Sequence, residues 1–177
     1  VVLGYPDVYS AASHVMEILS HEPIGLEGID QKLIGYMETT GVHTRNLKLL
    51  PPGKGWLLVE FGGETKEESD ERARQLMADL KQSHDPPSMK LFDDDKEEEQ
   101  VWKVRESGLG ATAFIPAKPD NWPGWEDSAV PPERVSEYLR DLRGLFDKFG
   151  YDASLYGHFG QGCIHCRIPF ELTTAEG

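Results

Sequence analysis

Apolar positions recur along the chain with two spacings, which separate expected helices from expected strands. Within residues 8–19, Val8, Ala11, Val15 and Ile18 lie three or four positions apart and predict an amphipathic helix. Short apolar runs at residues 1–4, 56–61 and 89–92 predict strands. Further helices are expected after Asp30, from the capping-box residue Thr65 to Leu80, up to Trp102, and from Pro132 to Phe149 with Gly150 as its cap.

The order of these elements bounds the fold. Strands alternate with helices, but none leads into the glycine-rich phosphate loop of a Rossmann unit. We therefore expect an α+β fold, ferredoxin-like, with a mainly antiparallel sheet and helices packed on one face. Residues 107–130, rich in Gly, Pro and Trp, are expected to be irregular. The 177 residues are expected to form a single domain, 1–177, that is a fragment of a longer protein.

Composition and charge narrow the class of protein. Hydrophobic residues make up 38% and charged residues 28% of the chain, as in a soluble globular domain. The net charge is −13, with a dense acidic run at residues 93–99, and such a surface repels phosphate backbones and anionic lipid. Nucleic acid is therefore not an expected partner, and no apolar run predicts a transmembrane segment. Two cysteines are too few for a disulfide scaffold, which favours a reducing compartment.

The most informative motif, residues 156–166, carries two histidines on either side of a glycine-rich turn. Gly160 and Gly162 are expected to adopt positive φ, so that the chain doubles back and His158 faces His165. Two imidazoles on facing strands can share one divalent ion, although two ligands make only half a metal site. The alternative, two histidines that only pack in a sheet, stays open at this point.

Cys163 and Cys166 lie in the same motif. Residues three apart on a strand point to opposite faces, so we expect buried structural thiols rather than a zinc or redox pair. By the same alternation, Cys163, His165 and Arg167 share one face of the strand.

Arg105, in the segment Trp102–Glu106, is a second candidate. An arginine beside a tryptophan at a helix end can present its guanidinium to a small carboxylate. A surface salt bridge with Glu106 or the acidic run is the open alternative. Residues 108–113 match the pattern of a dinucleotide-binding loop, but charged residues precede them instead of a buried strand, so we expect no dinucleotide there.

Three segments, taken in this order, give the chain a family resemblance: Trp102 to Glu106, Ala129 to Arg134 and Gly157 to His165. The chain resembles the C-terminal domain of FAD-linked oxidases and dehydrogenases. More narrowly, it resembles the branch that acts on D-2-hydroxy acids such as D-lactate, glycolate and D-2-hydroxyglutarate. The cysteine-containing form of the last motif is most similar to large bacterial proteins fused to an iron–sulfur oxidoreductase module.

The resemblance implies roles for particular residues. Arg105 corresponds to the arginine that binds the substrate carboxylate, and His158 and His165 correspond to two ligands of a divalent metal, zinc or manganese. Arg167, where some members carry an asparagine, is expected to bind a second carboxylate. Trp125 stands where some members carry a substrate-binding lysine. The third metal ligand and the catalytic base belong to a segment outside this chain, so no catalytic residue is expected within it.

These roles imply a flavoenzyme that oxidises a small 2-hydroxy acid to a 2-oxo acid. FAD would be bound mainly by a separate domain and an iron–sulfur cluster by the fused module, while the electron acceptor stays unassigned. The resemblance implies a cytoplasmic enzyme, or one that is peripheral at the inner face of the membrane, and an isolated chain that is inactive. A different class stays open: a non-catalytic binding or assembly domain of ferredoxin-like architecture.

Overall fold

Seven strands form one sheet, and helices pack against it. The computed structural model describes residues 1–122 and 128–177. The strands are β1 (Val2–Tyr5), β2 (Gly25–Asp30), β3 (Gly55–Glu60), β4 (Ser88–Lys90), β5 (Trp122–Ala129), β6 (Tyr156–Gly157) and β7 (Cys163–Ile168). The helices are α1 (Val8–Ser13), α2 (Val15–Leu19), α3 (Gln31–Thr40), α4 (Lys66–Leu80), α5 (Asp95–Glu106), α6 (Gly108–Ala113) and α7 (Val135–Phe149). Short 3-10 helices lie at Asn46–Leu49, Pro132–Arg134 and Phe159–Gln161.

The strand order is β4-β1-β3-β2-β6-β7-β5, and neighbouring strands run antiparallel. The first four strands, with α1–α2 and α4 as the crossovers, have the connectivity of a ferredoxin-like fold. β6, β7 and β5 then extend the sheet beyond β2, and α7 connects β5 to β6. The expected α+β class, antiparallel sheet and ferredoxin-like arrangement are therefore confirmed.

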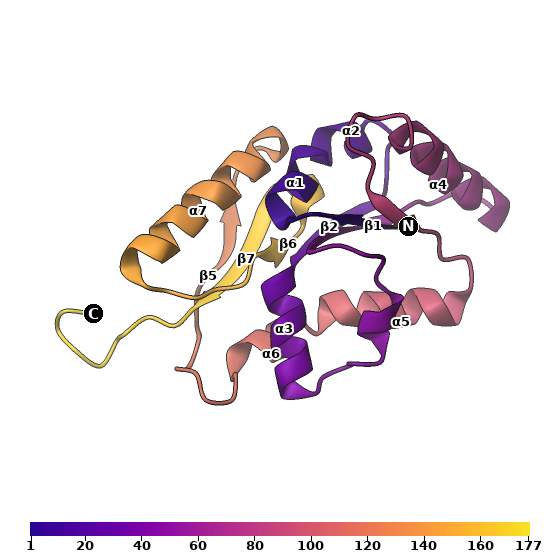
Figure 1. Ribbon diagram of the computed structural model, residues 1–177. Coiled ribbons are helices and arrows are strands. Elements are labelled where there is room, and N and C mark those ends of the chain that lie inside the picture. The colour runs from indigo at the N-terminus through magenta and orange to yellow at the C-terminus, as the bar shows by residue number, and fades with distance from the viewer.

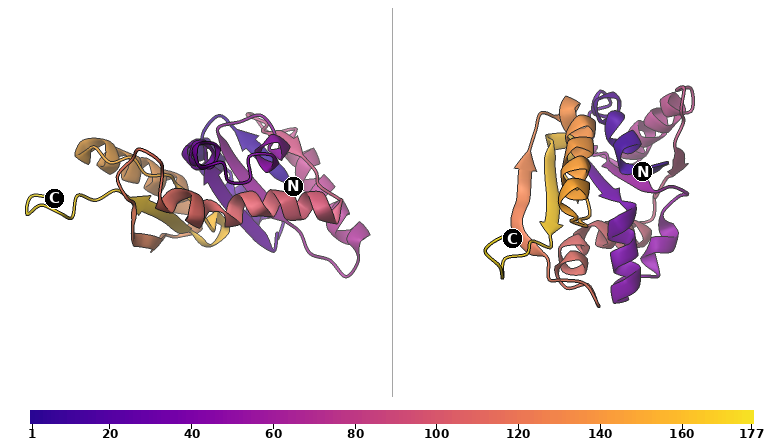
Figure 2. Two further views of the ribbon diagram at one scale, coloured as in Figure 1. Left: turned by 90° about the horizontal axis from the view of Figure 1, so that it is seen from below. Right: turned by 60° about the vertical axis from the view of Figure 1, so that its left-hand side comes forward.

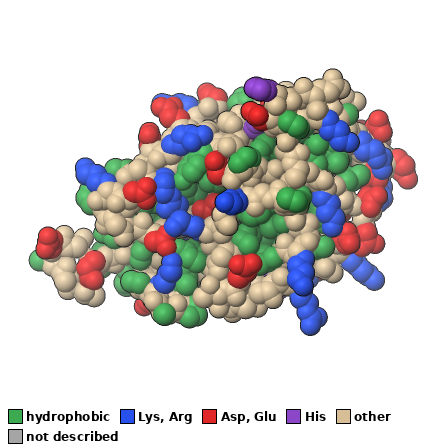
Figure 3. Space-filling view, in the orientation of Figure 1, with side chains coloured by type: hydrophobic (Ala, Val, Ile, Leu, Met, Phe, Trp, Pro, Cys, Tyr) green, Lys and Arg blue, Asp and Glu red, His purple; other side chains and the backbone are tan. Residues whose placement is uncertain are grey.

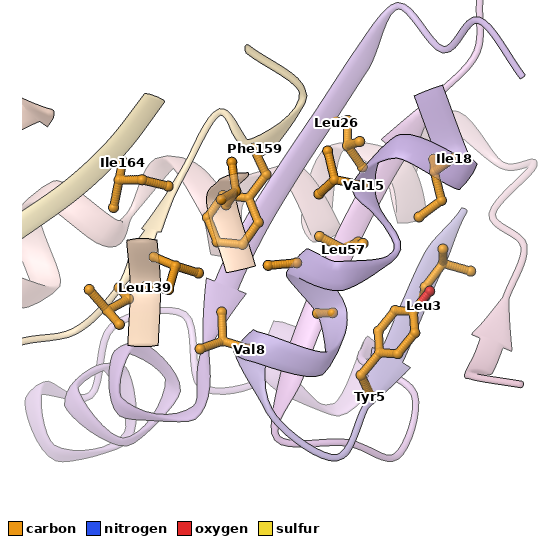
Figure 4. Close-up of a cluster of buried hydrophobic side chains, with 14 of the residues drawn as sticks. Leu3, Tyr5, Val8, Val15, Ile18, Leu26, Leu57, Leu139, Phe159 and Ile164 are labelled. Atoms are coloured by element: carbon orange, nitrogen blue, oxygen red, sulfur yellow. The ribbon is translucent and has the colours of Figure 1, made fainter. Parts of the chain in front are cut away.

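Helices cover both faces of the sheet, where the sequence predicts one covered face. In Figure 1, α1, α2, α4 and α7 lie above the sheet and α3, α5 and α6 lie below it. Leu26 and Leu57 pack with the upper helices in the cluster drawn in Figure 4, whereas Ile29 and Leu58 pack with the lower ones. The continuous apolar run at residues 56–59 is typical of a strand that is buried on both faces.

Capping groups fix the helix ends that the sequence predicts. The Asp30 carboxylate accepts the backbone N–H of Leu33 at 2.8 Å and caps α3, and the Thr65 hydroxyl caps α4 in the same way. Gly150 closes α7 in the left-handed conformation, with φ at 72°. The single helix expected first in the chain is instead two short helices, which meet at His14.

Two regions differ from the hydrophobic pattern. The pattern does not predict strand β2, yet this strand lies near the centre of the sheet between β3 and β6. Gly28 is required within it, because a Cβ there would lie 2.2 Å from the ring of Phe159. Residues 107–130, expected to be irregular, contain α6 and β5. Both strands depend on pairing and packing across the sheet, which local propensity does not report.

The C-terminal segment forms the expected hairpin, with Tyr156 opposite His165. Gly162 has φ at 70°, in the left-handed region, immediately before β7. Gly157 also has positive φ, at 152°. The prediction for Gly160 is wrong, since this residue lies within the 3-10 helix and is not among the glycines of positive φ.

Charged side chains are distributed unevenly over the surface. In the view of Figure 3, acidic side chains gather at the right-hand end, over α4 and the start of α5. Acids in the first turn of each of these helices are stabilised there by the partial positive charge of the helix N-terminus. The segment after β7 extends away from the body of the molecule (Figure 2). Among the described helices, none combines the length and the apolar character needed to cross a bilayer.

Candidate functional site

Arg105, in the last turn of α5, contacts the central strand β2. Val101 and Val104 bury one side of α5 against the sheet and so bring Arg105 over it. Its Nε donates to Oε2 of Glu27 at 2.5 Å, and the two side chains are only 13% and 10% exposed. The alternative of a surface pair with Glu106 or the acidic run is therefore wrong. Arg105 instead forms a largely buried ion pair with an acid on another element.

The same carboxylate contacts His158, which follows β6 directly. Nδ1 of His158 lies 2.6 Å from Oε1 of Glu27. Because a carboxylate only accepts hydrogen bonds, the neutral imidazole in this contact carries its proton on Nδ1. Nε2 is then the ring nitrogen with the lone pair that can bind an ion. The His158 side chain is 46% exposed, so solutes can reach the ring.

His165 joins this group from β7. Its ring centroid lies 5.0 Å from that of His158 and 5.4 Å from that of Tyr156. The Tyr156 ring in turn lies 5.5 Å from the guanidinium carbon of Arg105. Arg105, Glu27, His158, His165 and Tyr156 therefore form a closed ring of neighbouring side chains, which we call the five-residue circuit. The turn brings the two histidines together, as predicted.

The circuit contains only part of a metal site. No group of three or more His, Cys, Asp or Glu side chains among the described residues could hold a metal ion, and both oxygens of Glu27 already contact other side chains. Two imidazoles with centroids 5.0 Å apart can nevertheless bind one ion at the usual Zn–N distance of about 2.0–2.1 Å. Within the described residues the circuit therefore offers two imidazole ligands, and a zinc or manganese site would need at least one further ligand.

Strand alternation places the other residues of the motif as predicted. Cys166 faces the core on the α7 side of the sheet, whereas Cys163, His165 and Arg167 share the opposite, half-buried face. Burial raises the pKa of the Cys166 thiol to about 11, so the thiol is protonated at neutral pH. The two thiols lie on opposite faces of the strand, as predicted, but only Cys166 is buried, whereas Cys163 is half-buried. Arg167 lies about 7 Å along the strand from His165.

Glu27 is the member of the circuit that the sequence patterns miss. It lies in the unpredicted strand β2, where two glycines weaken the period-two signal. One feature of the sequence could have identified Glu27: it is an acid that lies between the apolar residues Leu26 and Ile29. A charged residue among buried ones needs a partner.

Two other sequence features, residues 108–113 and Trp125, lie outside the circuit. Residues 108–113 form α6, which follows α5 without an intervening strand, so they lack the context of a dinucleotide-binding loop. Trp125, the position that corresponds to a substrate-binding lysine in some members of the resembled family, lies outside the described residues.

The fold and the circuit agree with a family assignment that covers the chain from end to end. The family described as FAD linked oxidases, C-terminal domain, matches residues 1–177. The chain therefore belongs to this family and is a domain of FAD-linked oxidoreductases.

Curated relatives carry a more specific name. The D-2-hydroxyglutarate dehydrogenase of Pseudomonas putida is 24% identical over 97% of this chain, that of Pantoea ananatis 27% over 97%, and that of Escherichia coli 28% over 97%. Each alignment covers 18% of the relative, so the chain spans about a fifth of the length of these proteins. Their names fall within the branch of D-2-hydroxy-acid dehydrogenases that the motifs resemble.

Proposed function

We propose that this chain is the substrate-binding domain of an FAD-dependent dehydrogenase that oxidises a D-2-hydroxy acid to a 2-oxo acid. The observation that carries the proposal is the five-residue circuit, in which one guanidinium and two imidazoles meet in a partly buried group. Family membership supports the FAD-linked chemistry. The relatives' names support a small hydroxy acid, with 2-hydroxyglutarate as the first candidate.

Arg105 would bind the carboxylate beside the carbon that is oxidised. Glu27 engages Nε, so the two Nη nitrogens are the donors offered to the substrate. The contact with Tyr156 restrains the plane of the guanidinium. A planar guanidinium that is already held in place binds a carboxylate through two parallel hydrogen bonds and loses little further side-chain entropy.

His158 and His165 would supply two nitrogen ligands to a divalent metal, zinc or manganese. Such an ion, when bound, polarises a substrate hydroxyl and lowers its pKa. On this proposal the third ligand and the base come from another part of the full-length protein. Arg167, on the same face of β7 as His165, would bind the second carboxylate of a dicarboxylic substrate.

The cofactors and the location complete the proposal. FAD, bound mainly by a separate domain, would supply the hydride acceptor. An iron–sulfur cluster in a fused module would carry electrons onward to an acceptor that is not assigned, and the protein would be cytoplasmic or peripheral at the inner face of the membrane. Low-temperature electron paramagnetic resonance of the reduced full-length protein tests for the cluster, and a protein without iron would contradict this part.

Anaerobic reduction of the flavin tests the proposed reaction. The purified full-length protein is mixed with the D- and L-forms of 2-hydroxyglutarate and lactate and with glycolate, and flavin absorbance is followed. We expect at least one hydroxy acid to bleach the flavin, with the D-form preferred where two forms exist. Flavin that no 2-hydroxy acid reduces would overturn the proposal. The 177-residue chain alone should be colourless and inactive, because the flavin and the base are expected outside it.

A further inference from the structure

We propose that Glu27 is a positioning residue, which holds Arg105 and His158 in the orientations that substrate and metal require; this inference rests on the proposed function. The two oxygens of Glu27 contact different partners: Oε2 accepts from Nε of Arg105 at 2.5 Å, and Oε1 lies 2.6 Å from Nδ1 of His158. One carboxylate thereby links the group expected to bind substrate to a group expected to bind metal.

Burial makes both contacts necessary. The Glu27 side chain is 10% exposed, and a carboxylate that is removed from water needs a counter-charge and hydrogen-bond donors. Arg105 supplies the charge, because a guanidinium stays protonated throughout the physiological range. His158 supplies a second N–H donor. If either partner rotated away, the buried carboxylate would lose a hydrogen-bond donor. Glu27 therefore needs both partners, and both partners are held in place by Glu27.

The backbone provides a rigid base for this carboxylate. Within the sheet, Glu27 pairs with Leu58 of β3, and the next residue, Gly28, pairs with Gly157 of β6. Glu27 is therefore fixed from both sides, whereas Arg105 lies at a helix end and His158 in the turn of a hairpin. Arg105 and His158, which would contact the ligands, are thus held by Glu27, a residue of the central sheet that would not itself contact a ligand.

The expected consequences differ for the two partners. At Arg105, the bond to Nε sets which edge of the guanidinium faces the substrate. At His158, the carboxylate selects the tautomer that is protonated at Nδ1 and leaves the lone pair of Nε2 for the metal. An outer carboxylate of this kind typically changes metal affinity or activity by about 10–100-fold when it is removed.

Glu27→Gln separates positioning from packing in the full-length holoenzyme. Its amide oxygen can still accept from Arg105, but its NH2 group then faces Nδ1 of His158 and favours a proton on Nε2, where the metal would bind. Glu27→Asp keeps the charge on a shorter side chain and should restore part of the lost function. Glu60→Gln, which changes an exposed acid on the neighbouring strand β3, is the matched control.

We expect Glu27→Gln to weaken zinc binding, measured by competition with a chromogenic chelator, by about 10–100-fold. It should lower kcat/KM for the hydroxy acid by about 10–100-fold, since small misplacements of binding groups have effects of that size. Glu60→Gln should match the wild type in both. A lower melting temperature with unchanged zinc affinity and unchanged kcat/KM would overturn the inference, because Glu27 would then only stabilise the fold.

Arg105→Lys is measured in the same series, so that an error about Glu27 can be told apart from an error about the proposed function. If Arg105→Lys lowers kcat/KM and Glu27→Gln does not, only the role of Glu27 is overturned. If Arg105→Lys and folded Arg105→Ala both keep wild-type kcat/KM, the proposed binding of the substrate carboxylate by Arg105 fails, and the role of Glu27 in positioning Arg105 fails with it. Should Glu27→Gln not fold, Glu27→Asp takes its place, and wild-type zinc affinity and kcat/KM in that variant would contradict positioning. If the wild-type protein binds no zinc, kcat/KM alone decides.

Discussion

Arg105 and Glu27 are 78 residues apart in the chain, yet Nε and Oε2 lie 2.5 Å apart in an ion pair that connects α5 to the central strand β2. Because both side chains are largely buried, removing one of them leaves the other charge without compensation. Breaking a buried pair in this way typically costs about 3–5 kcal/mol. Truncation of Arg105 will therefore lower stability as well as activity, and only a substitution that keeps the charge can separate the two effects.

The glycine turn of the C-terminal hairpin can be tested with Gly162→Ala, and Gly144→Ala in helix α7 serves as the comparison. At Gly162 the φ of 70° is left-handed and a Cβ would collide with the carbonyl oxygen of Val130, so Gly162→Ala should destabilise the protein by at least about 1–2 kcal/mol. At Gly144, within α7, a Cβ would extend into open space, and Gly144→Ala should be stabilising by roughly 0.5–1 kcal/mol. Urea unfolding measures both; equal effects would contradict the assigned turn.

A buried acid predicts a pH dependence of stability. Burial raises the pKa of Asp30 from 3.8 to about 6, although two backbone N–H groups donate to it. Between about pH 4 and pH 6 the folded state therefore holds a proton that the unfolded state has lost. The contribution of Asp30 to the free energy of unfolding should therefore fall as pH rises through this window, by about 3 kcal/mol.

Asp30→Asn tests this dependence, because it removes the titrating group while keeping the shape. The amide has one acceptor oxygen for the N–H groups of Leu33 and Leu155, so the variant should lose about 1–3 kcal/mol at low pH, where Asp30 is protonated. This deficit should shrink or reverse as pH rises to about 7. The free energy of unfolding of both proteins is measured from about pH 4 to pH 7. A difference between them that stays constant with pH would show that Asp30 does not titrate as described.

Sequence patterns predict the periphery of this fold better than its centre. The helix after Asp30, the Thr65 cap, the Gly150 helix end and the C-terminal hairpin are all encoded by local residues, and each is found where expected. The patterns miss strand β2 because Gly25 and Gly28 disfavour an isolated strand. There, the ring of Phe159 occupies the space that a side chain at position 28 would need, and this close approach joins distant parts of the chain.

Sequence patterns likewise identify some residues of the candidate site and miss another. Arg105, His158 and His165 lie in short motifs, so the sequence identifies them and the structure brings them into one circuit. Glu27 has no local motif, and its role emerges only through partners on α5 and after β6. The sequence suggests partners for Arg105 among nearby acids, whereas the packing of α5 on the sheet sets the actual pairing.

The two cysteines should differ sharply in reactivity. Burial raises the pKa of Cys166 to about 11, so only about one thiol in a thousand is ionised at pH 8. Cys163 is half-buried and serves as the internal comparison. In the folded protein, iodoacetamide at about pH 8 should leave Cys166 unmodified, and both cysteines should react in urea. Peptide mass spectrometry reads out the sites, and rapid native labelling of Cys166 would contradict its assignment to the core.

The histidine pair predicts a metal dependence. In the full-length protein, His158→Ala and His165→Ala should each weaken zinc or manganese binding by at least about 10–100-fold, the range for losing even an outer-shell partner. His84→Ala, in a loop far along the chain from the hairpin, should bind metal as the wild type does. Calorimetric titration distinguishes the variants. Equal affinity in all four proteins would exclude the pair from metal binding.

The central claim, that Arg105 binds the substrate carboxylate, is tested most directly by kcat/KM of the full-length protein with Arg105→Lys and Arg105→Ala. Losing a carboxylate-binding guanidinium removes roughly 2–4 kcal/mol, so Arg105→Ala should lower kcat/KM by about 30- to 1,000-fold. Arg105→Lys keeps a charge for Glu27 and should recover only part, because an ammonium lacks the planar fork. Arg134→Ala, which removes an exposed pair with Glu137, is the control and should leave the rate unchanged. Wild-type kcat/KM in Arg105→Lys and in folded Arg105→Ala would contradict the account.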